Sequence, residues 1–251
     1  ADGGPDALRT LQEALDLSLN FWFILPLTFP SSAPVIHPAL EALFNLIVTW
    51  GLLCFGFIRD GRNQRVPMLP FLFGTAFLTN VFLVPYLALR NPFFSTADDD
   101  IHVDGAAAIA RVSVAGDECT RDSTSRLESV CESRAFGVVL GLVGVSTLAW
   151  FCWGRGGGGG GEYGGVIERA MTLWSLCTQG GQQGDRLAAS FAVDACVFWV
   201  LQAWLIPDDL RRRRAWTNPP AKKQQFSMAV ARFVPFFGVV YHLVTRPKLD
   251  R

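Results

Sequence analysis

Two apolar segments joined by a very short polar link constrain this chain more than any other feature. Residues 38–58, PALEALFNLIVTWGLLCFGFI, carry one charge over 21 residues, and residues 67–89, PMLPFLFGTAFLTNVFLVPYLAL, carry none over 23. At the helical rise of about 1.5 Å per residue, each segment can cross a hydrocarbon core of about 30 Å. Only RDGRNQRV separates them. The sequence therefore predicts an antiparallel helical hairpin whose turn lies in water.

Three further segments have the length and apolarity of membrane spans, namely 135–153, 187–206 and 226–244. A shorter stretch, 17–30, has 14 residues and two prolines, which suit a re-entrant or interfacial piece as well as a full crossing. Half of the chain is hydrophobic, only 18% is charged and the mean hydropathy is +0.28. We therefore expect an all-α, polytopic transmembrane protein of about five to six spans that forms a single integral membrane domain over residues 1–251.

The segments between the spans are of three kinds. Residues 91–134 are polar and acidic, and we expect an irregular aqueous insertion with a short helix near its end. Residues 154–165 form a glycine-rich tether, in which no strand or P-loop lysine supports phosphate binding. Residues 166–179 space apolar side chains at helical intervals. They predict an amphipathic helix that lies on the membrane surface or packs on its own protein.

Basic residues give conflicting signals about orientation. Arginines cluster in the turn at 59–66, and basic residues cluster again at 207–225. Basic loops favour the non-translocated side of a membrane, but three predicted spans lie between these two clusters. Either one of these three predicted spans is wrong, or the rule does not hold for this chain. The glycine-rich segment 135–153 is the weakest helix former of the three, although its glycines also permit close helix packing.

Asp194 lies eight residues into the segment 187–206, where an unpaired carboxylate is costly. The carboxylate should face other helices, be protonated or find a partner. Arg232, in the last span, is the basic candidate, although it lies closer to the loop that the two segments share. It can reach inward to Asp194 or outward to the acids that follow Pro207. Asp194 is thus either an ordered structural acid or a ligand or proton site.

The sequence PDDLRRRR follows the same span and cannot continue into lipid. We interpret it as a stop signal after Pro207. Its arginines are also candidates for binding anionic lipid headgroups or an acidic patch on a partner. These arginines are Arg211, Arg212, Arg213 and Arg214.

A second polar group lies at the start of the segment 38–58. His37, Glu41 and Asn45 are spaced four residues apart and share one helix face. They predict a hydrogen-bonded interfacial cluster, or else a metal or chlorophyll ligand at His37 and a proton relay through Glu41. His242 near the end of the last span is another possible pigment ligand. No cysteine spacing indicates a metal site.

Cys119 and Cys131, both in the polar insertion, are placed to form a disulfide if this loop faces an oxidising compartment. The other cysteines include three inside apolar segments, where a thiol behaves as a small hydrophobe.

The runs HPALEALFNLIVTWGLLCFGFIRDGR, FLTNVFLVPYLALR, FAVDACVFWVLQAWLIPDDLRRR and FVPFFGVVYHLV cover about the hydrophobic half of the chain. With these runs, the chain resembles uncharacterised multispan membrane proteins of plastids and cyanobacteria. Its layout is also similar to that of the small plastid membrane proteins required for neoxanthin formation, but their signature runs are not matched. The resemblance implies a chloroplast inner envelope or thylakoid location and transfers no catalytic motif.

These features lead to three functional hypotheses. The first is a non-catalytic accessory or scaffold subunit of a larger plastid membrane complex, photosynthetic or for protein translocation, that needs no cofactor but can bind lipid or pigment. The second is a membrane enzyme or binding protein for a hydrophobic small molecule such as a carotenoid or quinone. The third is a small transporter. Expected partners are membrane lipids and other integral subunits. The formal net charge of zero argues against nucleic acid.

Overall fold

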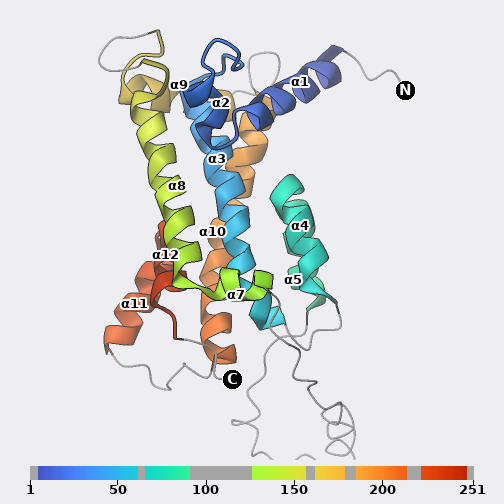
Figure 1. Cartoon of the computed structure of the whole chain (residues 1–251), viewed down its shortest axis with the longest axis vertical. Coiled ribbons are helices and arrows are strands. Elements are labelled where there is room, and N and C mark those ends of the chain that lie inside the picture. Colours follow the sequence, from blue (N-terminus) through green and yellow to red (C-terminus); the bar gives the residue numbers. More distant parts are fainter. Residues whose placement is uncertain are drawn as a thin grey trace, which may run out of the picture.

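The computed structural model describes residues 5–61, 66–90, 126–156, 162–178, 185–213 and 222–247, and most of these residues are helical, with no strand among them. Three helices are long and apolar enough to cross a membrane: Pro38–Ile58, Arg134–Gly156 and Arg186–Arg212. They contain α3 (Pro38–Leu53) with the 3-10 helix η2 (Cys54–Gly61), α8 (Arg134–Trp153) with η3 (Gly154–Gly156), and α10 (Arg186–Arg212). In Figure 1 they form an upright three-helix core. The prediction of five to six spans is not confirmed.

Residues 67–89 do not form the single span that their length predicts. They fold into α4 (Met68–Leu78) and α5 (Asn80–Leu89), with Thr79 between them at φ 47° and ψ −123°. The rings of Phe71 and Tyr86 lie with their centroids 5.6 Å apart. In a continuous helix these residues would be separated by about 22 Å. The segment therefore turns back at Thr79 and leaves at the end of the bundle where it entered (Figure 1).

The last predicted span, 226–244, is broken in the same way. It lies in α11 (Lys222–Phe233) and α12 (Phe237–Thr245), separated by a turn at which Phe236 has φ 57°. The hydroxyl of Tyr241 donates to that of Ser227 at 3.1 Å, although a continuous helix would separate these residues by about 21 Å. Pro235 helps to interrupt the helix because it lacks a backbone N–H. Both segments thus form helical hairpins, and we call them re-entrant because neither runs through the bundle in one direction as the three candidate spans α3, α8 and α10 do.

The stretch 17–30 does not cross either. It contains the end of α1 (Pro5–Leu19), then η1 (Phe21–Phe23) and the five-residue helix α2 (Ile24–Thr28), with positive φ at Trp22 and Phe23. These elements lie at the upper end of the bundle in Figure 1, with α9 (Val166–Thr178). The short helix α7 (Arg126–Glu132) precedes α8 at the lower end, as the sequence predicted. Residues 91–125 of the polar insertion and 157–161 of the tether lie outside the described residues.

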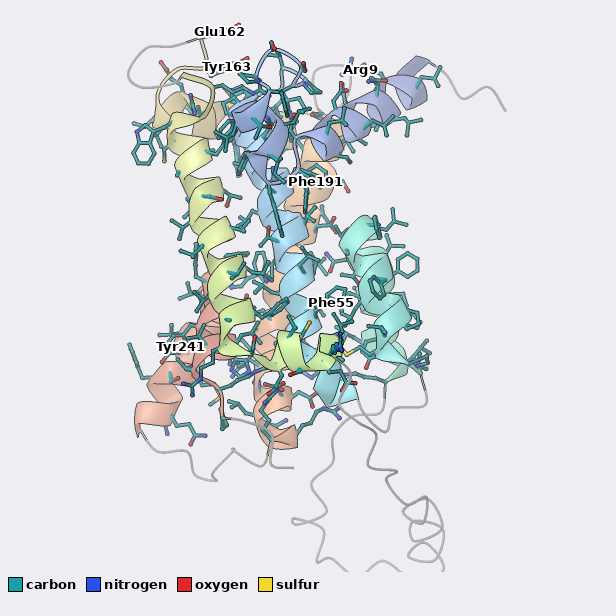
Figure 2. The ribbon with its side chains drawn as sticks, viewed as in Figure 1. Arg9, Phe55, Glu162, Tyr163, Phe191 and Tyr241 are labelled. Carbon is teal, nitrogen blue, oxygen red and sulfur yellow. The ribbon has the colours of Figure 1, made fainter. Side chains whose placement is uncertain are left out.

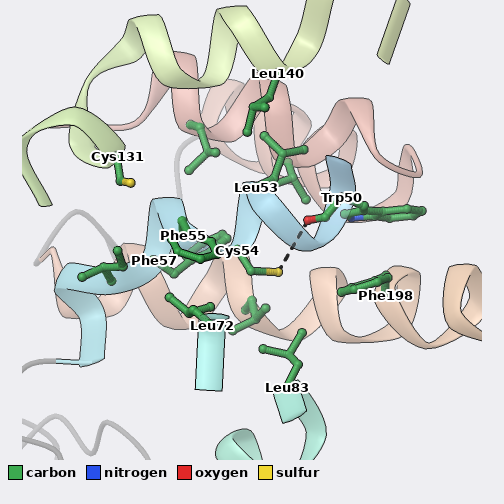
Figure 3. Close-up of a cluster of buried hydrophobic side chains, with 14 of the residues drawn as sticks. Trp50, Leu53, Cys54, Phe55, Phe57, Leu72, Leu83, Cys131, Leu140 and Phe198 are labelled. Carbon is green, nitrogen blue, oxygen red and sulfur yellow. Dashed lines mark hydrogen bonds between the residues drawn. The ribbon is translucent and has the colours of Figure 1, made fainter. Parts of the chain in front are cut away.

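The buried core joins the three long helices to the two hairpins. Trp50 of α3 stacks on Phe198 of α10, with ring centroids 5.8 Å apart, and packs edge to face against Phe236 at 6.0 Å. Leu72 of α4 and Leu83 of α5 are buried in the same cluster (Figure 3). The helix α3 is the centre of the core. In its apolar stretch 72% of the residues are buried, against 28% in the candidate span that contains α8 and 22% in α10.

The glycines of α8 explain how this poor helix former becomes a regular helix of 20 residues. A Cβ at Gly144 would lie 2.1 Å from the ring of Phe236, and one at Gly141 would lie 2.7 Å from Val240. The glycine face therefore lets α12 approach closely. The other side of α8 carries exposed apolar side chains, namely Val138, Val139, Leu142 and Val145.

Replacing Gly144 with leucine should expel the second hairpin from α8, because no room exists for the new side chain beside Phe236. We expect a loss of about 1–3 kcal/mol in unfolding free energy, measured as a lower melting temperature in detergent. The matched control is Val145→Leu, on the exposed face of α8. Equal melting temperatures for the two variants would show that the glycine face is not a packing surface.

The re-entrant path of α4 and α5 gives a second expectation. In a cysteine-free background, Val66→Cys and Leu89→Cys should react with a membrane-impermeant maleimide from the same side, because both ends of the hairpin lie at the lower end of the bundle. Ser31→Cys, exposed at the upper end, should react from the other side. Labelling of positions 66 and 89 from opposite sides would instead establish a single span.

Candidate functional site: three polar clusters along the spanning helices

The predicted polar stripe of α3 lies at the centre of a buried group, here called the upper cluster and formed by Asn20, Glu41, Asn45, Thr49, Trp150 and Arg155. The carboxylate of Glu41 is fully buried. It accepts hydrogen bonds from Asn20 Nδ2 at 2.6 Å and from Trp150 Nε1 at 2.7 Å, and it pairs with Arg155 Nη2 at 2.6 Å. One acid thus ties α3 to the chain after α1 and to the end of α8.

Asn45 and Thr49 continue the upper cluster downward. Asn45 Oδ1 accepts from the backbone N–H of Trp22 at 2.5 Å, and Thr49 Oγ1 accepts from the indole N–H of Trp22 at 3.2 Å. Trp22 has a positive φ, so the ordinary helical hydrogen bonds are interrupted there. The polar stripe of α3 therefore supplies the acceptors that the broken chain at η1 lacks.

His37 belongs to the N-terminal cap of α3 rather than to the upper cluster. Its Nδ1 accepts from the backbone N–H of Ala39 at 3.2 Å, and its ring lies edge-on to Tyr163, with centroids 5.5 Å apart. Burial, followed by the charge of Arg169, lowers the pKa of His37 below its usual value. Tyr163 lies at the upper end in Figure 2. Among the described residues, no group of three or more His, Cys, Asp or Glu side chains could hold a metal ion.

Two arginines at the upper end were missed by the sequence reasoning. Arg155, whose φ is 53°, pairs with Glu41. Arg169 of α9 is fully buried and donates to the carbonyls of Phe151 at 2.8 Å and Gly154 at 3.1 Å. A cation at these orphan carbonyls stabilises the C-terminal end of α8. In the sequence, each of these arginines stands close to a helix end. The glycine-rich residues around them made those helix ends hard to predict.

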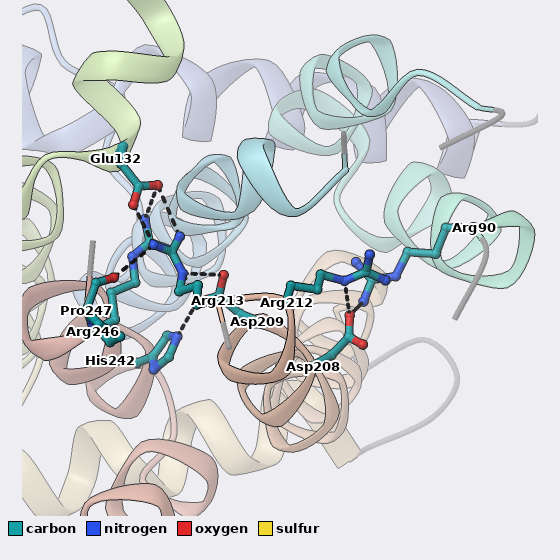
Figure 4. Close-up of polar contacts among 9 residues, drawn as sticks. All are labelled: Arg90, Glu132, Asp208, Asp209, Arg212, Arg213, His242, Arg246 and Pro247. Atoms are coloured by element: carbon teal, nitrogen blue, oxygen red, sulfur yellow. Dashed lines mark hydrogen bonds and ion pairs between the residues drawn. The ribbon is translucent and has the colours of Figure 1, made fainter. Parts of the chain in front are cut away.

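The lower end holds a larger buried ion network, shown in Figure 4 and here called the lower network. Asp209 accepts from Arg213 at 2.8 Å, from His242 Nε2 at 2.7 Å and from Arg246 at 3.5 Å. Asp208 pairs with Arg212 at 2.8 Å and with Arg90, which also stacks over the ring of Trp204. The lower network comprises Arg90, Glu132, Asp208, Asp209, Arg212, Arg213, His242 and Arg246.

Glu132 completes the lower network from α7. It pairs with Arg213 at 2.5 Å and with Arg246 at 3.1 Å. Burial alone would lower the pKa of Arg213, but its hydrogen bonds to Glu132 and the charge of Asp209 raise that pKa above its usual value. Arg213 is therefore a fixed cation that joins the ends of α7, α10 and α12.

The lower network corrects our interpretation of PDDLRRRR. The helix α10 does not stop at Pro207 but continues to Arg212, because the pairs from Asp208 to Arg212 and from Asp209 to Arg213 span single turns of helix. Arg212 pairs with Asp208, and Arg213 pairs with Asp209 and Glu132, so both belong to the lower network. Binding of lipid headgroups or of an acidic partner by the arginine run stays a prediction. Arg211 is exposed, and Arg214 lies outside the described residues.

His242 is likewise an internal partner. Its ring is buried, bonds Asp209 and stacks on Phe57, with centroids 6.0 Å apart. Cys131 of α7 is buried in the apolar core, and burial raises the pKa of its thiol to about 11. Its proposed disulfide partner, Cys119, lies outside the described residues.

The third cluster, here called the hairpin-tip site, consists of Thr79, Asn80 and Asp194. Asp194 Oδ2 accepts from the hydroxyl of Thr79 at 2.7 Å, and Oδ1 accepts from Asn80 Nδ2 at 2.9 Å. Asn80 Nδ2 also donates to the main-chain oxygen of Asp194 at 3.1 Å. Because Asn80 is the first residue of α5, the carboxylate also lies near the positive end of this helix.

Asp194 does not pair with Arg232. The guanidinium Nε of Arg232 donates to the carbonyl of Ala203 at 2.8 Å, and the group lies over the ring of Phe233. The neighbouring Gln202 Nε2 donates to the carbonyls of Ala231 at 2.7 Å and Val234 at 2.8 Å. The side chains of α10 and α11 thus satisfy backbone groups of the facing helix.

No family model, no curated protein and no solved structure matches this chain.

Removing one acid from the lower network should be far more damaging than removing an exposed one. Asp209→Asn leaves two buried arginines short of negative charge, so we expect a loss of about 3–5 kcal/mol in unfolding free energy. The control is Glu13→Gln, which breaks the exposed pair with Arg9 and should cost no more than about 1 kcal/mol. Denaturant unfolding in micelles measures both, and similar losses would contradict a structural role for the lower network.

Proposed function

We propose that this chain is a non-catalytic accessory or scaffold subunit of a larger membrane assembly, located in a plastid membrane. The single observation that carries the proposal is the wide apolar face that α8 leaves uncovered while its glycine face is used inside the chain. Along this face Val139 is 55% exposed, Leu142 64% and Val145 53%. Such a face fits either lipid or the apolar face of another subunit's helix.

The polar clusters support the same proposal. The side chains that sequence reasoning offered as catalytic or ligand groups have intramolecular partners: Glu41 with Arg155, His242 with Asp209, and Arg232 with the carbonyl of Ala203. These contacts join helices of one chain to one another, which is what a scaffold subunit needs. The plastid location rests on the resemblance of the apolar runs.

Native gel separation tests the proposal. After mild-detergent solubilisation, we expect the chain to run with a defined large assembly, identified by mass spectrometry and by the absorption spectrum of the band. Replacing both Leu142 and Val145 with tryptophan adds bulk to the uncovered face of α8 without adding much polarity. Because this bulk should block contact with a neighbouring subunit, most of the chain should run on the gel as a free monomer. Phe77→Trp, at an 83% exposed site on α4, is the matched control. A wild-type chain that runs alone would refute the proposal.

One observation favours a second candidate, a small transporter. Two re-entrant hairpins enter from the same end of the bundle, and the first carries polar side chains at its tip. Broken helices of this kind line substrate and ion sites in membrane transporters. Solute uptake by proteoliposomes, lost in Asp194→Asn, would support this candidate over a scaffold.

A further inference from the structure

The helix α1 turns its apolar side away from the rest of the chain. Four of its leucines follow one another at intervals of three, four and four residues, so they share one face of the helix. This leucine stripe consists of Leu8, Leu11, Leu15 and Leu19, which are 52% to 68% exposed. The acids Glu13 and Asp16, on other sides of the helix, are half-buried. A surface helix of a water-soluble domain has the reverse arrangement, with its apolar stripe against the core.

A fifth leucine fixes the position of α1 on the bundle. Leu17 lies two residues from both Leu15 and Leu19, so at about 100° per residue it points away from the leucine stripe. Leu17 is buried in a small second core cluster with Leu40 and Ala188. These two partners are the third residues of α3 and α10, which both belong to candidate spans. The end of α1 is therefore held at the level where two candidate spans begin.

Other elements at this level also expose apolar side chains. The helix α9 packs Leu176 against the same small cluster and leaves Ile167, Met171 and Trp174 exposed. Tryptophan is enriched where membrane helices meet the headgroup region. In Figure 1, α1 lies across the upper end of the bundle rather than along it. The leucine stripe is thus part of an apolar rim around the first turns of α3 and α10.

The charge of α1 restricts the surface that can cover the leucine stripe. The helix contains one arginine and three acids, a formal charge of −2. Helices that bind anionic membranes carry lysine and arginine on their polar face, because the lipid charge adds to the attraction. For α1 the same charge would repel. A surface that covers the stripe must therefore be apolar beneath and uncharged at its headgroups.

We propose that α1 is a membrane-interface helix whose leucine stripe inserts into a bilayer surface of neutral lipids. The stripe lies at the boundary between headgroups and acyl chains, at a depth of about 5–10 Å. The polar side chains pair along the helix, Arg9 with Glu13 at 3.0 Å and Gln12 with Asp16 at 2.9 Å, and remain among the headgroups. The proposal does not depend on the scaffold function, because it uses α1 at the upper end and not the uncovered face of α8.

Spin-label accessibility of the whole chain in phosphatidylcholine nanodiscs tests the proposal. In a cysteine-free background, a nitroxide is attached at Leu11→Cys or Leu15→Cys, with Arg9→Cys as the control on the charged side. The two leucine positions should give a several-fold higher ratio of collisions with oxygen, which dissolves in hydrocarbon, to collisions with a water-soluble nickel chelate. All three sites are exposed, so the variants should fold, and size-exclusion chromatography checks this.

Two results of this measurement would overturn the proposal. Equal ratios at the three positions would mean that the leucine stripe lies in water. Labels at positions 11 and 15 that are shielded from both oxygen and the nickel chelate would mean that a second copy or another protein covers the stripe. Neither result would bear on the native-gel test of the scaffold function, which probes α8.

The lipid composition tests the neutral character of the surface. The ratio at Leu11→Cys should not fall when the ionic strength is raised to about 1 M, at which charges are screened beyond about 3 Å. It should also be no higher when phosphatidylglycerol, an anionic lipid, replaces part of the phosphatidylcholine. Insertion only into the anionic nanodiscs, or loss of insertion in salt, would overturn the assignment of a neutral surface.

A matched pair of substitutions tests whether the leucines themselves hold α1 in the lipid. With the nitroxide at Leu8→Cys, the double change Leu11→Gln and Leu15→Gln removes two apolar side chains from the stripe but keeps good helix formers. The ratio at position 8 should fall several-fold. Gln12→Glu, at an exposed polar site, is the control and should leave the ratio unchanged. An unchanged ratio in the double variant would contradict the assigned role of the stripe.

Discussion

A helix that breaks inside a bilayer leaves N–H and C=O groups that no water can satisfy, and the rest of this structure depends on how one helix meets that demand. The helix α10 faces both breaks. The carboxylate of Asp194 accepts from the side chains at the turn between α4 and α5, where α5 begins and donors are in excess. The amide of Gln202 donates to the carbonyls of Ala231 and Val234, at the end of α11 where acceptors are in excess. An acid lies at a helix start, and an amide donor lies at a helix end.

Sequence reasoning predicted the three long helices and the existence of the polar stripe on α3, because apolar length and residue spacing are local properties. It did not predict the breaks at Thr79 and Phe236, since hydropathy measures how apolar a segment is and not whether the chain reverses within it. Neither residue is a glycine, so composition gave no warning of a positive φ. The partners of Glu41 and Asp194 could not be predicted either, because they lie far from these acids in the sequence.

The conflict between the two basic clusters disappears once residues 67–89 are a hairpin. Two candidate spans, α8 and α10, then separate the end of η2 from the end of α10, so both helix ends lie at the same end of the bundle. The wrong span was 67–89, not the glycine-rich segment that sequence reasoning doubted. The described arginines near the lower end are Arg90, Arg126, Arg134, Arg211, Arg212, Arg213 and Arg246, against Arg9, Arg155, Arg169 and Arg186 near the upper end. In membrane proteins in general, such an excess of basic residues is typical of the non-translocated side.

The dependence of both hairpins on α10 has a consequence for biogenesis. The first hairpin is synthesised well before α10, and its polar tip and Arg90 have their partners on that later helix. While α10 is still in the ribosome, Thr79 and Asn80 lack their partner Asp194, and burying unsatisfied polar groups in lipid is costly. The second hairpin is synthesised after α10, so it can pack on that helix as soon as it forms. The first hairpin can therefore complete its polar contacts only after α10 has been synthesised, although it precedes α10 in the sequence.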